Sequence, residues 1–490
     1  MKSNSPPTPS LTQSRPSTDQ QLSYTFHRHG TAIRSLTERF ALVFVEGPPG
    51  SGKSTLAQTL AADGALVQSF NRPGDRRRLQ TGASAIVPKH RKGTARNILV
   101  IDNADPVRVL SQIIELRTWI VAGWRLVCMA SQRSDQVRRA IRDHLPSPDH
   151  RTAGADFGVY ALPGIPAPDR IALDPDSWPY SWLHGDLIDA LSAEDDQASD
   201  QRRLDTVESI CFAFNPPIKP AYRTRTFEDR MARMKRNLAD NQIDEQALDA
   251  IARTPELEPY YQPRHSRPDA LMRFARLVAH AIVQPLNFSA LARTYGVAPH
   301  TAEAHFAALE RHLLTWRQPP FVALLPSRPQ SRLVRRPRAF FTDTGLLHAL
   351  LEVTTLDELL AHSLAAQSWT NFVVNALRHH FGLSPAELPF WANHTGLQVD
   401  ALWRSRTPAP VQGTRATPAT HGGALCAAIA TLEPRPRLNR VLRTTCERLQ
   451  LDTLWLITPG NRSYPLSEQV HVLAIRDFAQ LRAPAAPACG

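Results

Sequence analysis

A glycine-rich segment, Gly47-Pro48-Pro49-Gly50-Ser51-Gly52-Lys53-Ser54, has the residue types and spacing of a phosphate-binding loop. It fits the pattern Gly-x-x-x-x-Gly-Lys-Ser/Thr, in which glycines let backbone amides turn inward around a phosphate at a helix N-terminus. The Lys53 ammonium would supply a point charge to the β- and γ-phosphates, and the Ser54 hydroxyl would bind Mg²⁺. Residues Gly47 to Thr55 are therefore predicted to hold the phosphates of ATP, with Mg²⁺ as the accompanying cation.

A second candidate is the carboxylate at the end of an apolar run, residues 97–102 (NILVID). Asp102 is predicted to complete the Mg²⁺ site with Ser54, because such sites take an Asp from the end of a neighbouring buried strand. The alternative is a turn residue, since Asp102, Asn103 and Asp105 would also suit a loop.

The residue after Asp102 bears on hydrolysis. Many P-loop ATPases have a Glu at this position, and this chain has Asn103. An amide can orient the attacking water but cannot take its proton, so we expect ATP binding with slow hydrolysis. Ser131 and Gln132, just after another apolar run, are candidate sensors of the γ-phosphate, although such residues also end strands routinely. The predicted catalytic set is Lys53, Asp102, Asn103 and Ser131.

The elements that must position these residues are apolar runs alternating with helical patterns. The runs cover residues 41–47, 97–102 and 124–131, and a helical pattern separates the last two. Strands that alternate with helices imply a parallel sheet. The fold class predicted for this part is α/β, a three-layer P-loop NTPase fold with a mostly parallel sheet.

The length of 490 residues points to about three folded units. Residues 287–314 contain two amphipathic segments joined by a Gly-containing turn, and β-type residues follow, which suggests a winged helix. The segment after it mixes a helix with strands, as a smaller α/β domain would. The predicted divisions are a disordered tail (1–23), the P-loop domain (24–165), a helical connector (166–268), the winged-helix domain (269–359), the smaller α/β domain (360–482) and a loose tail (483–490).

Four blocks follow one another along the chain: the glycine-rich loop, Trp182-Leu183-His184-Gly185, the segment expected to be a winged helix, and residues 331–351. The last block contains Pro337-Arg338, Phe341 and Asp343-Thr344-Gly345-Leu346. In this order they resemble the prokaryotic family of AAA-type ATPases joined to domain of unknown function 4143. The resemblance covers nearly all of the chain after about residue 30. It implies an ATPase whose nucleotide state is relayed to the C-terminal domains.

The same resemblance implies a C-terminal domain like a restriction-endonuclease core, which gathers a divalent metal with several carboxylates. Thr370 and Gln398 stand where the family has Glu, and Ala427-Ala428-Ile429 falls on its Glu-x-Lys strand. Only Asp400 keeps its carboxylate, and one carboxylate cannot hold a hard cation. We therefore expect a degenerate nuclease-like domain without nuclease activity, which serves as a scaffold or docks a protein partner.

Nucleic acid is a second possible partner, because the net charge is +12 and the pI is about 9.9. The second helix of the predicted winged helix is a poor base reader, because its exposed face would offer His300, Thr301, Glu303 and His305. Basic clusters could contact phosphates without sequence preference, or could be solvated loops. They are Arg76-Arg77-Arg78, His90-Arg91-Lys92 and Arg332 to Arg338.

Several features limit the class of protein. The five cysteines are far apart, so neither a disulfide framework nor a zinc site is expected. His27, His29, His379 and His380 lack metal-ligand spacing and are expected at the surface. No apolar run is long enough to span a membrane, and the N-terminus lacks a secretory signal, so we expect a cytoplasmic protein. The alternative function is a nucleotide-gated adaptor or switch that does not hydrolyse ATP.

Overall fold

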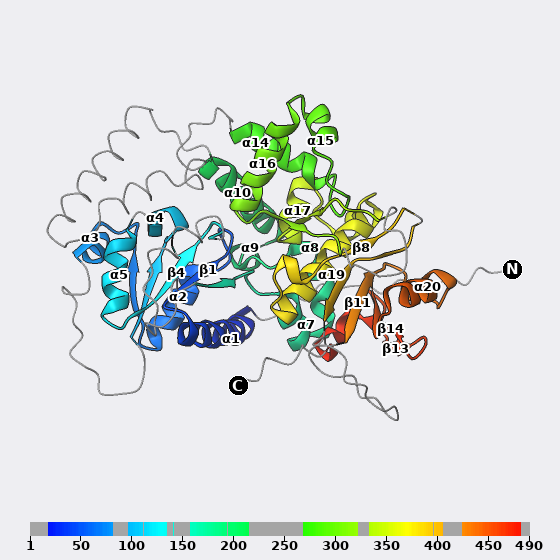
Figure 1. Ribbon diagram of the computed structural model, residues 1–490, viewed down its shortest axis with the longest axis horizontal. Coiled ribbons are helices and arrows are strands. Elements are labelled where there is room, and N and C mark those ends of the chain that lie inside the picture. Colours follow the sequence, from blue (N-terminus) through cyan, green and yellow to red (C-terminus); the bar gives the residue numbers. More distant parts are fainter. Residues whose placement is uncertain are drawn as a thin grey trace.

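The computed structural model describes residues 18–81, 97–110, 112–134, 141, 157–193, 195–214, 268–321, 333–394, 396–404 and 424–481. One five-stranded sheet lies at each end of the long axis, and helices fill the space between them (Figure 1). The expected tails lie largely outside the described residues, as does much of the connector. The first helix begins at Thr18, ahead of the boundary expected at residue 24.

The N-terminal sheet has the strand order β2-β3-β4-β1-β5, and every pair in it is parallel. Alternate residues of each strand face two separate cores, one toward α1 and α2 and the other toward α3 and α5. This confirms the α/β class and the parallel sheet. The elements are α1 (Thr18–Arg39), β1 (Leu42–Glu46), α2 (Lys53–Ala62), β2 (Leu66–Ser69), α3 (Pro73–Thr81), β3 (Ile98–Asp102), α4 (Pro106–Leu110), α5 (Ile113–Val121), β4 (Arg125–Ala130) and β5 (Gly158–Ala161).

The central part is helical and ends in a two-stranded antiparallel sheet. Helices α14 to α16 enclose a core that includes Phe274 and Phe306, and β6 pairs with β7. An isolated bridge from Pro285 to Arg338 adds a third extended segment beside β7. The elements are α7 (Ala167–Leu173), α8 (Trp178–His184), α9 (Ile188–Leu191), α10 (Asp196–Phe214), α14 (Pro268–Ala279), α15 (Phe288–Tyr295), α16 (Pro299–Arg311), β6 (Thr315–Gln318) and β7 (Arg338–Phe341), with a 3₁₀ turn at Pro175–Ser177.

The C-terminal sheet has the order β10-β11-β12-β14-β13, with parallel pairs at its centre and antiparallel pairs at both edges. Helix α19 packs against one face through Trp369 and Phe372, and α20 packs against the other through Leu442 and Cys446. The elements are α17 (Thr344–Leu351), α18 (Leu356–Ala361), α19 (Ala365–Phe381), β8 (Trp391–Ala392), β9 (Gln398–Val399), β10 (Ala401–Arg404), β11 (Leu425–Ala430), α20 (Arg440–Leu449), β12 (Thr453–Thr458), β13 (Tyr464–Pro465) and β14 (Val470–Ala474), with 3₁₀ turns at Pro385–Glu387 and Ile475–Gln480.

A buried polar junction joins the connector to the start of α17. The Asp343 carboxylate accepts hydrogen bonds from the backbone amides of Leu346, at 2.8 Å, and of Asp186, at 2.5 Å. Arg170 donates to the carboxylate of Asp186 at 2.7 Å and to the Gly185 carbonyl at 2.6 Å. Because the Asp343 side chain also caps α17, one residue fixes both the helix and the connector segment that leads into α9.

Two histidines expected at the surface are buried instead. His29 is 3% exposed and its ring approaches Tyr160 and the Gly164 carbonyl. The side chain of His379 is 7% exposed and lies 3.7 Å from Asp186. Burial lowers the pKa of His29 to about 4 and the pKa of His379 well below its usual value. Local sequence patterns could not indicate this burial, because the residues that cover both rings are distant in the chain.

Gly345 lies where α17 meets α8. A Cβ atom at this position would overlap the carbonyl oxygen of His184, which is backbone and cannot rotate away. We expect Gly345→Ala to lower the free energy of unfolding by about 2–3 kcal/mol, as overpacking of a core does. Gly74→Ala is the control, because nothing lies within 4 Å of the added atom. Urea denaturation of the two variants checks this, and equal stabilities would contradict the packing described.

His348 links three helices, because its ring approaches the Leu183 carbonyl at 2.8 Å and the Ser368 hydroxyl at 2.7 Å. Burial lowers the pKa of His348 from 6.5 to about 4. The unfolded chain therefore takes up this proton first, and the stabilisation from a neutral His348 is lost as the pH falls from about 6.5 to about 4.

We expect His348→Gln to remove about 3 kcal/mol of the acid-induced loss of stability between these pH values. Urea denaturation of the wild type and the variant at pH 7 and at pH 4.5 measures the difference. Parallel pH dependence of the two proteins would show that His348 is not buried in its neutral form.

Candidate functional site

The glycine-rich loop connects β1 to α2 at the carboxyl end of the parallel sheet. Gly50 and Gly52 have φ angles of 80° and 83°, a left-handed conformation that glycine adopts without strain. A Cβ atom at Gly52 would also overlap the side chains of Ile188 and Phe26. The backbone conformation therefore favours glycine here, and a side chain would also displace Ile188 and Phe26.

Lys53 is the first residue of α2 and folds back over the loop. Its Nζ donates hydrogen bonds to the carbonyl oxygens of Gly47 and Pro48, both at 2.7 Å. Burial lowers the pKa of Lys53 to about 8, although Asp105, Asp102 and Asp189 act against this shift in that order. The ammonium is thus held at the loop by carbonyl oxygens, with three carboxylates around it.

Ser54 and Asp102 meet although they come from different elements, α2 and β3. The Ser54 hydroxyl donates to Oδ2 of Asp102 at 3.5 Å, and Ser54 and Thr55 are exposed. A hydroxyl and a carboxylate oxygen at this separation suit a hard cation that keeps some of its water ligands. The two residues predicted to bind Mg²⁺ are therefore side by side and accessible.

Asn103 has a conformation that the sequence did not predict. Its φ angle is 56°, in the left-handed region that Asn tolerates better than most residues. Its side-chain amide donates to Oδ2 of Asp102 at 3.2 Å and to the Ser69 hydroxyl at 3.4 Å. The side chain supports the Asp102 carboxylate from the β2 side, so it acts on the candidate metal ligand and not on the glycine-rich loop.

Asp105, which the sequence suggested only as a loop residue, lies at the site. Its Oδ1 accepts a hydrogen bond from the backbone amide of Ser131 at 3.2 Å. Burial raises the pKa of this carboxyl against the opposing charges of Arg108 and Lys53. The backbone of Ser131 is therefore bonded to a carboxylate that follows β3. The only sequence signal was an acidic residue shortly after Asp102.

Backbone hydrogen bonds join the loop region to the connector and to the central helices. The backbone amide of Asp189, in α9, donates to the Gly50 carbonyl at 3.3 Å, and the Asp189 carboxylate stands 3.3 Å from the position of a Cβ at Gly50. On the other side, the amide of Arg133 donates to the carbonyl of Arg311 at 2.9 Å, at the end of α16. The connector and the central helices thus both touch the edge of the site.

At the C-terminal sheet, Asp400 is paired with an arginine. Asp400 accepts a hydrogen bond from Arg338 at 3.2 Å and another from the Ala430 amide at 3.0 Å, and both side chains are almost fully buried. Arg338 also donates to Gln398 and lies over the ring of Phe390. In the part of the chain that the structure describes, no three His, Cys, Asp or Glu side chains are grouped to hold a metal ion.

This pair corrects one expectation. Arg338 was grouped with the basic loop that could contact nucleic acid, but it is 5% exposed and lies between β7 and the C-terminal sheet. Its distant partner, Asp400, could not be identified from the basic run around it. Thr370 donates to the Ala366 carbonyl of its own helix and takes no part in the pair.

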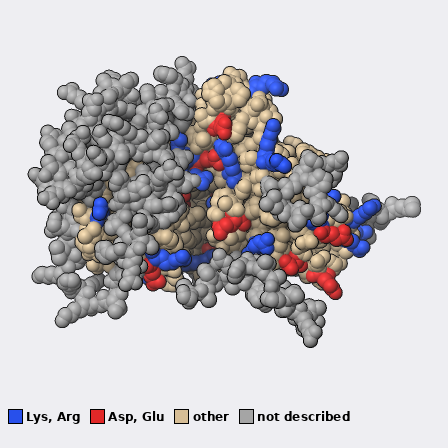
Figure 2. Space-filling model, viewed as in Figure 1, with Lys and Arg blue, Asp and Glu red and all other residues tan. Residues whose placement is uncertain are grey.

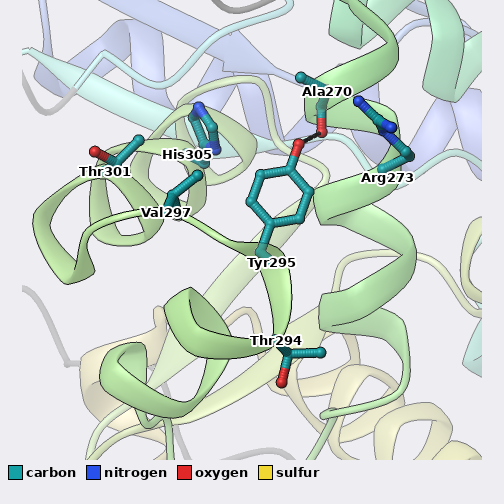
Figure 3. A pocket seen from close by; sticks show the side chains of 7 residues that line it. All are labelled: Ala270, Arg273, Thr294, Tyr295, Val297, Thr301 and His305. Carbon is teal, nitrogen blue, oxygen red and sulfur yellow. Dashed lines mark hydrogen bonds between the residues drawn. The ribbon is translucent and has the colours of Figure 1, made fainter.

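The central helical part contains a hollow of about 510 Å³ between α14, α15 and α16. Figure 3 shows Tyr295 reaching across it to the carbonyl of Ala270, with Arg273 beside this contact. His305 lines the hollow and packs against the rings of Phe274 and Tyr295. His305 is therefore 6% exposed and cannot read bases, contrary to its expected place on an open helix face.

The described surface shows no single basic face in the view of Figure 2, where Lys and Arg are interspersed with Asp and Glu. Arg76 is used within the fold, because its guanidinium donates to the Phe70 carbonyl at 2.7 and 3.0 Å. The cluster His90-Arg91-Lys92 and Arg332 lie outside the described residues. No helix among the described residues is long and apolar enough to cross a membrane.

Comparisons with known proteins give partial matches. A family model described as a domain of unknown function, DUF8612, matches residues 257–357. Two uncharacterized proteins, from Mycobacterium bovis and Mycobacterium tuberculosis, are each 28% identical over 205 residues, which is 41% of this chain and 41% of theirs. The match thus spans less than half the length of these relatives.

Among solved structures, a Walker-type ATPase of Pyrococcus abyssi matches with a TM-score of 0.32 and 10% identity. The match covers 69% of this chain and 95% of that one. A TM-score this low is not sufficient to equate the two folds.

We expect the Arg338–Asp400 pair to show strong coupling. Arg338→Met leaves a buried carboxylate without its cation and should destabilise the protein by about 3–5 kcal/mol. Adding Asp400→Asn removes the stranded charge while keeping an acceptor for the Ala430 amide, so the double variant should be more stable than Arg338→Met alone. Urea denaturation of the wild type, Arg338→Met, Asp400→Asn and the double variant measures this, and a double loss equal to the sum of the two single losses would contradict a direct pair.

Proposed function

We propose that the protein binds Mg²⁺-ATP with Gly47–Thr55, Ser54 and Asp102 and hydrolyses it slowly. The observation that carries this proposal is the meeting of Ser54 and Asp102, at 3.5 Å, beside the loop that Lys53 closes. Glycines with left-handed φ angles, a lysine and a paired hydroxyl and carboxylate are what a triphosphate with a divalent cation requires. When bound, Mg²⁺ would neutralise phosphate charge, and Lys53 would exchange its carbonyl partners for phosphate oxygens.

The nucleotide state would reach the other domains through the contacts at the edge of the site. Asp189 and Ile188 pack against the glycine-rich loop. Just before them, the Asp186 amide is hydrogen-bonded to Asp343 at the start of α17. Arg133 follows the candidate sensor residues and is bonded to α16. A change of the loop or of the sensor segment on binding ATP would therefore act on α9 and α16.

We also propose identities for the two other units. The order of three helices followed by the antiparallel pair β6 and β7, with a bridging segment beside β7, supports a winged helix. The order α19, β10, β11, α20 and β12 supports a nuclease-like core that has lost its chemistry, because Arg338 takes the place of a cation at Asp400. Both fit the resemblance to AAA-type ATPases with domain of unknown function 4143.

A nucleotide-gated adaptor that does not hydrolyse ATP is the second candidate. Asn103 favours it, because its amide is committed to Asp102 and Ser69 and provides no base. The partner would then be a protein that docks on the C-terminal domain, or nucleic acid held without sequence preference by basic loops. ATP binding is common to both candidates, and phosphate release separates them.

We expect Lys53→Ala to weaken binding of a fluorescent ATP analogue by about 10- to 100-fold, the loss of one or two charged hydrogen bonds. Gln58→Ala, an exposed change on the same helix, is the control and should bind as the wild type does. Titration in the presence of Mg²⁺ measures the affinities, and phosphate release is followed in the same samples. Equal binding by wild type and Lys53→Ala would refute the proposed site.

A further inference from the structure

The turn after β3 brings Asp105 toward the glycine-rich loop, whereas the sequence pattern pointed to position 103. Asn103 takes a left-handed conformation, and the amide of Ala104 then donates to the carbonyl of Met129 at 2.9 Å. The chain thereby stays bonded to β4 beyond the end of β3, with Ala104 fully buried. As a consequence Asp105, and not Asn103, extends along β4 toward the residue that follows that strand.

Asp105 is bonded to the segment after β4 and interacts electrostatically with Lys53. Oδ1 is used by the amide of Ser131, the first residue after β4. Among the carboxylates that act on the Lys53 ammonium, Asp105 has the largest effect, ahead of Asp102. Asp105 is half-buried, so it is partly screened from water.

The other carboxylates around Lys53 have different positions. Asp102 is bonded to Ser54 and to the amide and side chain of Asn103, so its oxygens serve the cation position. Asp189 lies outside the loop, over Gly50, and is exposed. Asp105 is thus the carboxylate of this group that lies on the sensor side of the loop, where a γ-phosphate would be sensed.

We propose that Asp105 is the carboxylate that activates the attacking water in ATP hydrolysis, in place of the acidic residue that is absent at position 103. This inference rests on the proposed ATPase function. Asp105 Oδ2 accepts a hydrogen bond from the water while Oδ1 remains bonded to Ser131. Because this base lies at position 105 and not at position 103, we expect ATP hydrolysis to be slow but measurable.

The reaction balances without a further reactant. The water oxygen forms a bond to the γ-phosphorus, and the bond from that phosphorus to the bridging oxygen breaks with its electron pair remaining on ADP. The water gives one proton to Asp105, which passes it to the released phosphate or to solvent. The carboxylate is thereby regenerated for the next turnover.

The test compares Asp105→Asn with the wild type in single-turnover hydrolysis of ATP with Mg²⁺, so that product release does not hide the chemical step. Asn keeps the size of the side chain and an oxygen for the Ser131 amide. We expect the rate to fall at least about 100-fold, the usual contribution of a general base. Binding of the fluorescent ATP analogue should stay within a fewfold of the wild type.

Two more variants complete the test. Asp105→Glu restores a carboxylate and should give a rate between those of the wild type and Asp105→Asn. Asp63→Asn is the matched control at the exposed end of α2, where Asp63 pairs with Arg34, and it should not change the rate.

The outcomes separate the two levels of the account. A wild type that binds no ATP overturns the proposed function and this inference together. Binding and hydrolysis by the wild type with an unchanged rate in Asp105→Asn overturns only the inference. Binding without any hydrolysis by the wild type also overturns it and leaves the adaptor function.

Discussion

The Asp343 carboxylate bonds two backbone amides that are far apart in the chain, those of Asp186 and Leu346. Asp343 is buried away from water, and this burial raises the pKa of its carboxyl group. Such a group persists only where its hydrogen bonds are satisfied and positive charge is near, here Arg170 and Arg203. The interaction sets the position of the connector segment at Asp186, and this segment leads directly into α9.

The position of α9 matters because it packs against the glycine-rich loop. Ile188 and Phe26 leave no space for a side chain at Gly52, and the Asp189 amide bonds the carbonyl of Gly50. The loop is therefore shaped by residues of the connector as well as by its own glycines. On the C-terminal side, Arg338 in β7 pairs with Asp400 at the C-terminal sheet. Asp343 follows β7 closely, so the residue that bonds Asp186 is also connected to the C-terminal sheet.

The features that could be predicted are those that a short stretch of contiguous sequence determines. The loop, its flanking strand and helix, and the Asp102 carboxylate follow from contiguous patterns, and the structure brings Lys53, Ser54 and Asp102 together. The role proposed for Asp105 depends on one backbone angle at Asn103, which no periodicity encodes. The burial of His29, His379 and Arg338 depends on surfaces supplied by segments distant in the chain. Their basic or polar sequence neighbours therefore predicted exposed side chains, which was wrong.

The most direct test is a structure of the protein with Mg²⁺ and a non-hydrolysable ATP analogue. The account predicts the β-phosphate inside the loop from Gly47 to Thr55, the cation between Ser54 and Asp102, and a water held by Asp105 in line with the γ-phosphate. A nucleotide bound elsewhere would contradict the site itself. A nucleotide in the loop with Asp105 turned away from the γ-phosphate would contradict the mechanism.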